Sequence, residues 1–274
     1  TGEAPYPVVL VNHGNGQQKF NFEYAPTQHW LNNGYAVYSQ TARGYGYTCL
    51  LNKNDPGCEK GYSHLMDFRY EVRDAQNILG LLADENLIQP TKIATTGNSY
   101  GGGMSMSLAV LKDRVMDLDG SLKLWKSPEG KQLEIAVAAP LATWTDFSYA
   151  MAPNGNAVDY IQDAGYYGPT GVMKESYVQG LIPAAFNAPI GTDPQADILG
   201  WKAMLDAGEP YDSNPVVAEM REEVGTYHSS YGLPPTQAPA PTFIVQGFTD
   251  DIFPVDEATR FYNRTRALFP DVPV

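Results

Sequence analysis

The chain of 274 residues lacks a long apolar run, because no stretch approaches the roughly 18 apolar residues of a membrane-spanning helix. It is also poor in basic residues: 18 Lys and Arg stand against 31 Asp and Glu, a formal net charge of −13. Proteins that bind duplex nucleic acid usually show the opposite balance, since Lys and Arg neutralise phosphates. The sequence therefore predicts no membrane span and disfavours a nucleic-acid partner.

Cysteine is equally scarce, and its two copies, Cys49 and Cys58, flank the turn-forming segment NKNDPG. Their spacing fits no metal-binding motif, which favours a disulfide that closes a short loop over two free cytosolic thiols. Disulfides persist outside the reducing cytosol, so we expect a secreted, extracellular protein. Neither a phosphate loop nor a correctly placed G-x-G-x-x-G occurs, and we expect no metal and no cofactor.

Short apolar runs alternate with segments of helical periodicity, which predicts an α/β fold with a mostly parallel sheet. The alternation breaks between about 145 and 235. We interpret residues 1–144 and 236–274 as one core domain and residues 145–235 as a cap inserted into it, with an irregular loop system as the alternative. The predicted strands are 8–12, 35–40, 91–96, 133–139 and 242–246, and the main core helices are 26–33, 67–84, 101–111 and 255–268.

The strongest chemical motif is Gly97-Asn98-Ser99-Tyr100-Gly101, a G-x-S-x-G between a predicted strand and a predicted helix. A serine on such a sharp turn needs glycine two positions away on each side, because side chains there would clash. This context predicts a nucleophile elbow that presents the Ser99 hydroxyl at a helix N-terminus. An ordinary strand-to-helix turn is the alternative.

The loop Asn12-His13-Gly14-Asn15-Gly16 follows the first predicted strand. In serine hydrolases of this architecture that loop supplies a backbone donor to the oxyanion. We predict an oxyanion hole made by the backbone amides of Gly14, Asn15 and Tyr100. His13 precedes the nucleophile, so we interpret it as a residue that packs the loop and not as the catalytic base.

A third motif, Gly247-Phe248-Thr249-Asp250, follows the last predicted strand. A carboxylate in this position suits the group that orients a catalytic histidine, and we predict that Asp250 has this role. Asp251 is the fallback, and a solvated or helix-capping carboxylate is the alternative for either.

The segments GNSYGG, HGN, ARGYGYTC, APLATWTDF and GFTDDIFPVDEATRFYNRTRA together resemble the α/β-hydrolase superfamily. More narrowly, they resemble secreted hydrolases of the X-prolyl dipeptidyl-peptidase and cocaine-esterase type. The resemblance implies Ser99 as nucleophile and Asp250 as triad acid, in the chain order Ser, Asp, His. It is weak over 145–235.

That chain order requires a histidine after Asp250, but His13, His29, His64 and His228 all precede it. The expectation is that the last strand, the catalytic histidine and the last helix of the fold are missing from this chain and lie in a C-terminal segment. His64 or His228 as base is the alternative.

We therefore predict a serine hydrolase that cleaves a small-molecule ester or a peptide bond. Trp144, Phe147 and Tyr149 could line the substrate pocket, although a packed core of the cap is the other interpretation. A catalytically silent α/β-hydrolase scaffold that acts as a binding module is the alternative function, favoured by the lack of a histidine after Asp250.

The disulfide gives the first testable prediction. By chain entropy, a bridge between Cys49 and Cys58 is worth about 2–3 kcal/mol. Reduction, or the double change to Ser, is expected to lower the free energy of unfolding by that amount. Intact mass spectrometry should find no free thiol in the native protein, and two thiols that alkylate under native conditions would contradict the bridge.

Overall fold

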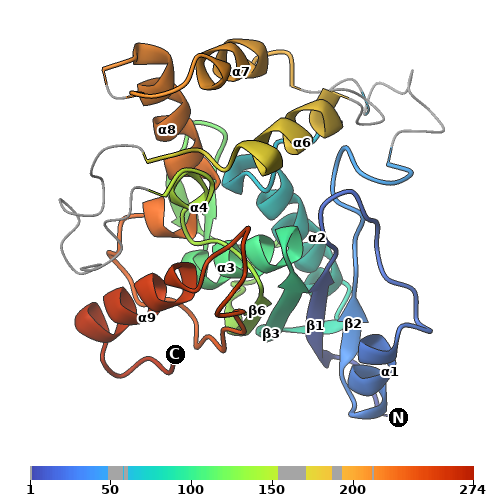
Figure 1. The fold of residues 1–274 in the computed structure, drawn as a ribbon. Coiled ribbons are helices and arrows are strands. Elements are labelled where there is room, and N and C mark those ends of the chain that lie inside the picture. Colours follow the sequence, from blue (N-terminus) through green and yellow to red (C-terminus); the bar gives the residue numbers. More distant parts are fainter. Residues whose placement is uncertain (1, 49–57, 59–60, 154–170, 187–192, 212) are drawn as a thin grey trace.

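The computed structural model describes residues 2–48, 58, 61–153, 171–186, 193–211 and 213–274 (Figure 1). Cys49 lies outside these residues, and so do Tyr160, Tyr166 and Tyr167 of the predicted cap. Cys58 is buried. The disulfide stays a prediction.

A parallel four-stranded sheet forms the centre of the molecule, in the strand order β2-β1-β3-β6. The two central strands are β1 and β3, and both lie where apolar runs predict buried strands. The bounds are β1 (Tyr6–Asn12), β2 (Ala36–Tyr38), β3 (Ile88–Asn98) and β6 (Ile135–Leu141). The register pairs Asn12 with Gly97 and Asn98 with Leu141, so the carboxyl ends of three strands meet beside Ser99.

The segment predicted as a fifth strand, 242–246, does not form a continuous strand. It runs parallel to β6 and makes only isolated bridges, Ala138 to Thr242 and Leu141 to Val245. Its outer edge is contacted by the last residues of the chain, since Thr242 N–H donates to Pro273 O (3.0 Å). This segment still extends the sheet order beyond β6, and Asp250 follows it.

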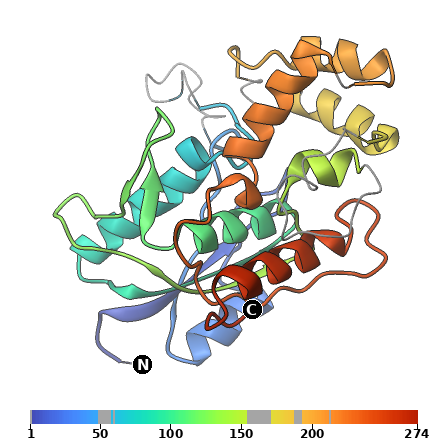
Figure 2. The ribbon, with the colours of Figure 1, turned by 90° about the vertical axis from the view of Figure 1, so that its left-hand side faces the viewer.

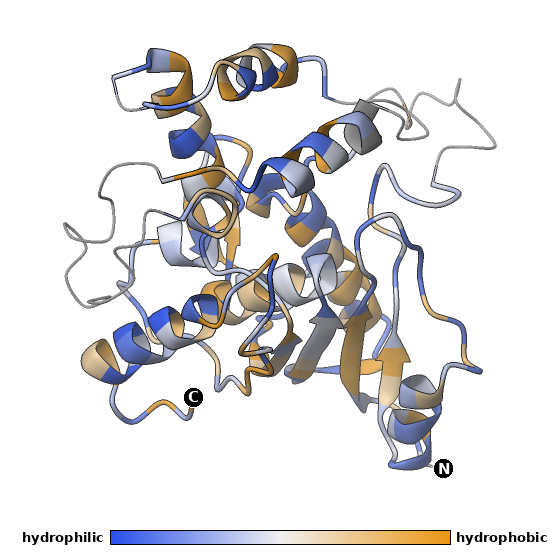
Figure 3. Ribbon diagram, viewed as in Figure 1, coloured by the Kyte–Doolittle hydropathy of each residue, from blue (hydrophilic) through white to orange (hydrophobic). Residues whose placement is uncertain are grey.

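The core helices lie close to their predicted positions. The helical stretch predicted for 67–84 begins with a π-helical turn, η2 (Phe68–Val72), before α2 (Arg73–Asp84). The helix α3 is buried around most of its circumference, as expected of a helix packed between a sheet and outer elements. In Figure 3, α3 ranges from pale to orange, whereas α9 is mostly blue and therefore hydrophilic. The other bounds are α1 (Ala25–Asn32), α3 (Tyr100–Leu111) and α9 (Asp256–Leu268).

The hairpin that follows α3 was not predicted. Its strands are β4 (Arg114–Met116) and β5 (Leu122–Leu124). Three-residue strands are too short to show a period of two, so the sequence carries little signal for them.

The segment predicted as a cap contains helices that lie beyond the carboxyl ends of the strands (Figures 1 and 2). The bounds are α4 (Phe147–Met151), α6 (Glu175–Phe186), α7 (Ile198–Asp206), α8 (Pro215–Tyr227) and the 3-10 turn η3 (Ser230–Gly232). Among the described residues, no helix is both long and apolar enough to cross a membrane.

A buried ion pair joins α9 to the start of the cap. Glu257 and Arg260 have fully buried side chains and a contact of 2.9 Å. The Glu257 carboxylate also accepts hydrogen bonds from the backbone amides of Thr145 (2.7 Å) and Asp146 (2.9 Å). The guanidinium of Arg260 lies over the Tyr149 ring (4.2 Å). Burial raises the pKa of Glu257, which makes these donors necessary to the fold.

The second prediction follows from this ion pair. Glu257→Gln leaves the Arg260 charge buried without its carboxylate, and we expect the free energy of unfolding to fall by about 3–5 kcal/mol. Urea denaturation measures the change. Glu222→Gln, on the exposed side of α8, is the matched control and should have an effect below about 0.5 kcal/mol. Equal effects of the two changes would contradict the anchoring role.

Candidate active site

Ser99 is the turning point between β3 and α3. Its backbone has φ 57° and ψ −121°, a conformation that non-glycine residues rarely adopt. Such a residue carries strain of about 1–3 kcal/mol and persists only where the surrounding structure enforces it. Ser99 N–H donates to Leu141 O (3.0 Å) and Ser99 O accepts from Gly103 N–H (2.9 Å). The side chain is half-buried, at the carboxyl edge of the sheet.

The glycines around Ser99 are required by close backbone contacts. A Cβ atom on Gly97 would lie 2.7 Å from Asn12 O, and one on Gly101 would lie 2.4 Å from the same oxygen. Gly102 and Gly103 are equally constrained, by Leu141 O (2.5 Å) and by the Trp144 ring (2.8 Å). The G-x-S-x-G pattern accounts only for Gly97 and Gly101. The other two allow α3 to pack directly against β6 and the segment that follows it.

The loop after β1 lies at the same sheet edge. Gly14 N–H donates to Gln17 Oε1 (3.1 Å), so this predicted oxyanion donor is occupied by a side chain of its own loop. The Asn15 side chain accepts a hydrogen bond from the Tyr45 hydroxyl (2.7 Å). No acceptor for Asn15 N–H is recorded in the described part of the chain. Tyr100, the third predicted donor, opens α3, and its amide lies in the first turn of the helix, where N–H groups have no partner within the helix.

Asp250 lies in the loop that follows the segment 242–246. Its Oδ1 atom accepts from the backbone amides of Ile252 (3.1 Å) and Phe253 (2.9 Å). Within the described residues, no hydrogen bond to Oδ2 is recorded, which leaves that oxygen available to orient another group. The Lys174 ammonium donates to Ile252 O (3.0 Å) and so ties the same loop to the cap. The fallback carboxylate, Asp251, is exposed and accepts a hydrogen bond from the Tyr177 hydroxyl.

Of the three aromatic residues predicted for a substrate pocket, Trp144 and Tyr149 are buried. Trp144 is 2% exposed and donates from Nε1 to His228 O (2.7 Å). Its ring lies 5.0 Å from that of Phe147, which is half-buried. Tyr149 is 8% exposed and covers Arg260. The cluster fills the space between α3, α4 and α9, which favours the interpretation as a packed core.

None of the four histidines makes a recorded contact with Ser99 or Asp250. Both ring nitrogens of His13 are engaged, with Gly14 O (2.7 Å) and Ala42 N–H (3.0 Å), and His29 is exposed on α1. His64 contacts the Asp193 carboxylate through Nε2 (3.0 Å) and stacks on Tyr70. The alternative in which His64 or His228 is the base therefore gains no support.

His228 belongs to a charged cluster that joins α8 to the start of η2. Its Nδ1 lies 2.9 Å from Leu65 O, and its Nε2 lies 3.6 Å from the Asp67 carboxylate and 3.9 Å from that of Glu223. Asp67, Glu223 and His228 lie close enough together to be candidate metal ligands. The Arg69 guanidinium, however, binds both carboxylates. Because a cation already occupies this position, the group does not suit a metal ion.

A buried carboxylate that the sequence analysis missed holds the loop beside this cluster. Glu71 accepts from the backbone amides of His64 (2.6 Å) and Asp67 (3.1 Å). Between them, Leu65 and Met66 have positive φ angles of 52° and 62°. Burial raises the pKa of Glu71 to about 7. Glu71 lies in the π-helical turn η2, which the sequence did not predict.

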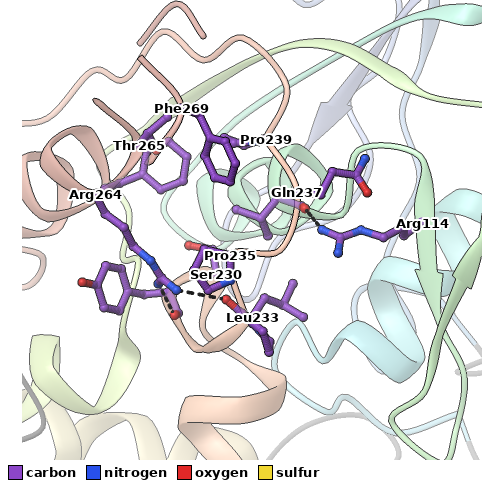
Figure 4. A pocket seen from close by; sticks show the side chains of 13 residues that line it. Arg114, Ser230, Leu233, Pro235, Gln237, Pro239, Arg264, Thr265 and Phe269 are labelled. Carbon is purple, nitrogen blue, oxygen red and sulfur yellow. Dashed lines mark hydrogen bonds between the residues drawn. The ribbon is translucent and has the colours of Figure 1, made fainter. Parts of the chain in front are cut away.

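Arg43 pairs with Asp74 in a bidentate contact (2.6 and 2.7 Å). A separate pocket lies between α3, residues 230–239 and α9 (Figure 4). Its guanidiniums, those of Arg114 and Arg264, donate to backbone carbonyls of Val110, Tyr231 and Leu233. None of the predicted site residues lines this pocket, so we assign it to packing.

Comparison with solved structures identifies the architecture. A truncated carbohydrate esterase from gut microbiota matches 97% of this chain at 15% identity, with a TM-score of 0.50. Acetyl xylan esterase 1 from Thermoanaerobacterium sp. JW/SL YS485 matches 96% at 13% identity, with a TM-score of 0.53. A prolyl endopeptidase matches 100% at 12% identity, with a TM-score of 0.52. The chain has the α/β-hydrolase fold.

These structural matches confirm the fold class predicted from the sequence. The chain spans 75% of the carbohydrate esterase, 66% of the acetyl xylan esterase and 29% of the prolyl endopeptidase. No protein-family model matches the sequence. These three structures include esterases and a peptidase, and the narrower resemblance to X-prolyl dipeptidyl peptidases and cocaine esterases stays a prediction.

The His228 cluster gives the third prediction. Burial alone would lower the pKa of His228, but Glu223, Asp67 and Leu65 O outweigh it and raise the pKa. The stabilisation is therefore fully present below the unfolded pKa of about 6.5 and is lost as the pH rises through the folded pKa. His228→Asn should cost most stability below about pH 6.5 and progressively less above it.

Thermal unfolding from pH 5 to 9 measures this difference between the native protein and the variant. Exposed His29→Asn is the control and should lower the melting temperature less than His228→Asn does at pH 5. A constant difference for His228→Asn would show that the cluster does not stabilise the protonated ring.

Proposed function

We propose that this chain carries the nucleophile, acid and oxyanion-binding elements of a serine hydrolase. The observation that carries the proposal is the strained backbone of Ser99 at the strand-to-helix turn, enforced by the backbone contacts of Gly97 and Gly101 with Asn12 O. Backbone strain of this kind clusters at active sites, where the surrounding structure enforces it. The likeness to esterases and a peptidase supports the same chemistry.

In the proposed reaction, Ser99 Oγ attacks the carbonyl carbon of an ester or amide and gives its proton to a histidine. The tetrahedral intermediate collapses, the C–O or C–N bond breaks, and the leaving alcohol or amine takes the proton. Water then attacks the acyl-enzyme and releases the acid, and Ser99 recovers its proton. The amides of Tyr100 and of the loop after β1 bind the oxyanion. Gly14 would have to exchange Gln17 Oε1 for substrate to take part.

We assign the orientation of the histidine to Asp250, whose Oδ1 is held by two loop amides while Oδ2 is left for Nδ1–H of the imidazole. The histidine is proposed to come from a segment that continues the sheet beyond residues 242–246. Strand alternation places Val137, Phe243 and Val245 on the face opposite α3, and these side chains are 41%, 69% and 45% exposed. A further strand with its helix would cover this apolar face and bring a side chain to Asp250.

The substrate class within this proposal is an acyl ester or an amide. The comparison proteins are named for both kinds of bond, and their names do not favour one of the two for this chain. Hydrolysis of short-chain p-nitrophenyl esters against proline-containing peptide amides distinguishes the two classes in the full-length protein.

The fourth prediction concerns the nucleophile. A fluorophosphonate probe is expected to modify the full-length protein at Ser99, and Ser99→Ala should abolish labelling and lower kcat at least about 10³-fold. Peptide mass spectrometry locates the adduct. Ser121→Ala, in the exposed β4–β5 hairpin, is the control and should label at the native rate. A folded full-length protein that stays unlabelled and inactive would instead favour the catalytically silent binding module.

A further inference from the structure

The peptide group between Gly14 and Asn15 is held from one side by two donors. Gly14 O lies 2.7 Å from His13 Nδ1 and accepts from Gln17 N–H at 3.2 Å. In a trans peptide the C=O and N–H bonds point in opposite directions. The contact that turns Gly14 O toward the buried imidazole therefore turns Asn15 N–H to the opposite side of the loop.

The tautomer of His13 follows from its second contact. Ala42 N–H donates to His13 Nε2 (3.0 Å), so Nε2 must carry a lone pair and not a proton. The neutral ring then carries its proton on Nδ1, which makes Nδ1–H the donor to Gly14 O. Burial lowers the pKa of His13, in agreement with a ring that stays neutral. Protonation of Nε2 would require the loss of the Ala42 hydrogen bond.

The imidazole ring of His13 packs between two tyrosine rings, one of which belongs to the residue after Ser99. It stacks on Tyr100, with centroids 5.7 Å apart and an interplanar angle of 18°, and meets the edge of Tyr45 at 5.3 Å. Tyr100 follows Ser99 directly, and Tyr45 also holds the Asn15 side chain. His13 thus links the loop after β1 to the residue whose amide is the other oxyanion donor.

We propose that His13 is a positioning residue that presents Asn15 N–H as the loop's oxyanion donor, and this inference rests on the proposed serine-hydrolase function. Gly14 N–H is engaged by Gln17, so Asn15 supplies the donor that complements Tyr100 N–H. His13 does not touch the reacting atoms. It acts by donating its Nδ1 proton to Gly14 O, which fixes the direction of Asn15 N–H.

Two substitutions at His13 separate this role from simple packing. The amide nitrogen of Asn lies near the position of Nδ1 and can donate to Gly14 O. The amide oxygen of Gln reaches the position of Nε2 and can accept from Ala42 N–H, but it offers no donor at Nδ1. We expect His13→Gln to lower kcat for a p-nitrophenyl ester by about 10²-fold with little change in KM. His13→Asn should lose less than about tenfold.

The comparison is made in the full-length protein, with melting temperatures recorded for both variants. Equal losses of kcat in the two variants, in parallel with their loss of stability, would overturn the positioning role. A wild-type protein that neither labels at Ser99 nor hydrolyses the ester would overturn the proposed function itself, whereas normal labelling with equal variants would overturn only the role of His13.

A measurement on the wild-type protein covers the case in which a variant does not fold. The ¹⁵N chemical shifts of the His13 ring report its tautomer directly. We expect a protonated Nδ1 and an unprotonated Nε2 throughout pH 6–8. A ring protonated at Nε2 in that range would overturn the proposal, because Nδ1 would then have no proton to donate to Gly14 O.

Discussion

The close approach of two backbones, at the end of β1 and in the first turn of α3, is the constraint on which the rest of the site depends. Asn12 O lies where side chains at Gly97 or Gly101 would stand. The Asn12 side chain adds hydrogen bonds to Thr95 Oγ1 (3.0 Å) and Ser105 Oγ (3.2 Å), which tie β1 to both β3 and α3. Because these contacts fix β1 against β3 and α3, the backbone of Ser99 is held in its strained conformation. They also place the loop after β1 beside Ser99.

Buried charge connects the cap to this rigid centre. Glu257 accepts hydrogen bonds from two backbone amides at the start of the cap. Arg69 contacts Glu223 of α8, and Asp67 contacts His228, which follows that helix. A buried charged group is costly unless it is paired, so each cluster stabilises one arrangement of the elements it joins. These charges thus place loops and helices, and His64 and His228 are both held in such contacts.

The sequence predicts the parts of this structure that depend on local chemistry. Apolar runs located β1, β3 and β6, and the glycines around Ser99 predicted a bend that the backbone confirms. What depends on distant partners was missed. The aromatic residues after β6 have the composition of a binding pocket, but Phe253 packs on Trp144 and Arg260 of α9 lies over Tyr149. Glu71 is buried in a π-helical turn. Segment 242–246 is apolar like a strand, yet it makes only isolated bridges.

The exposed face of the sheet and the proposed position of the base lie in the same region. Phe243 and Val245 are exposed on the segment that leads to Asp250, and Thr242 N–H on that segment donates to Pro273 O at its outer edge. Asp250 offers one oxygen held by the loop and one without a recorded partner among the described residues. A further strand and its helix at this edge would cover the apolar surface. The same segment would bring a histidine to the free oxygen of Asp250, so packing and proton transfer both favour it.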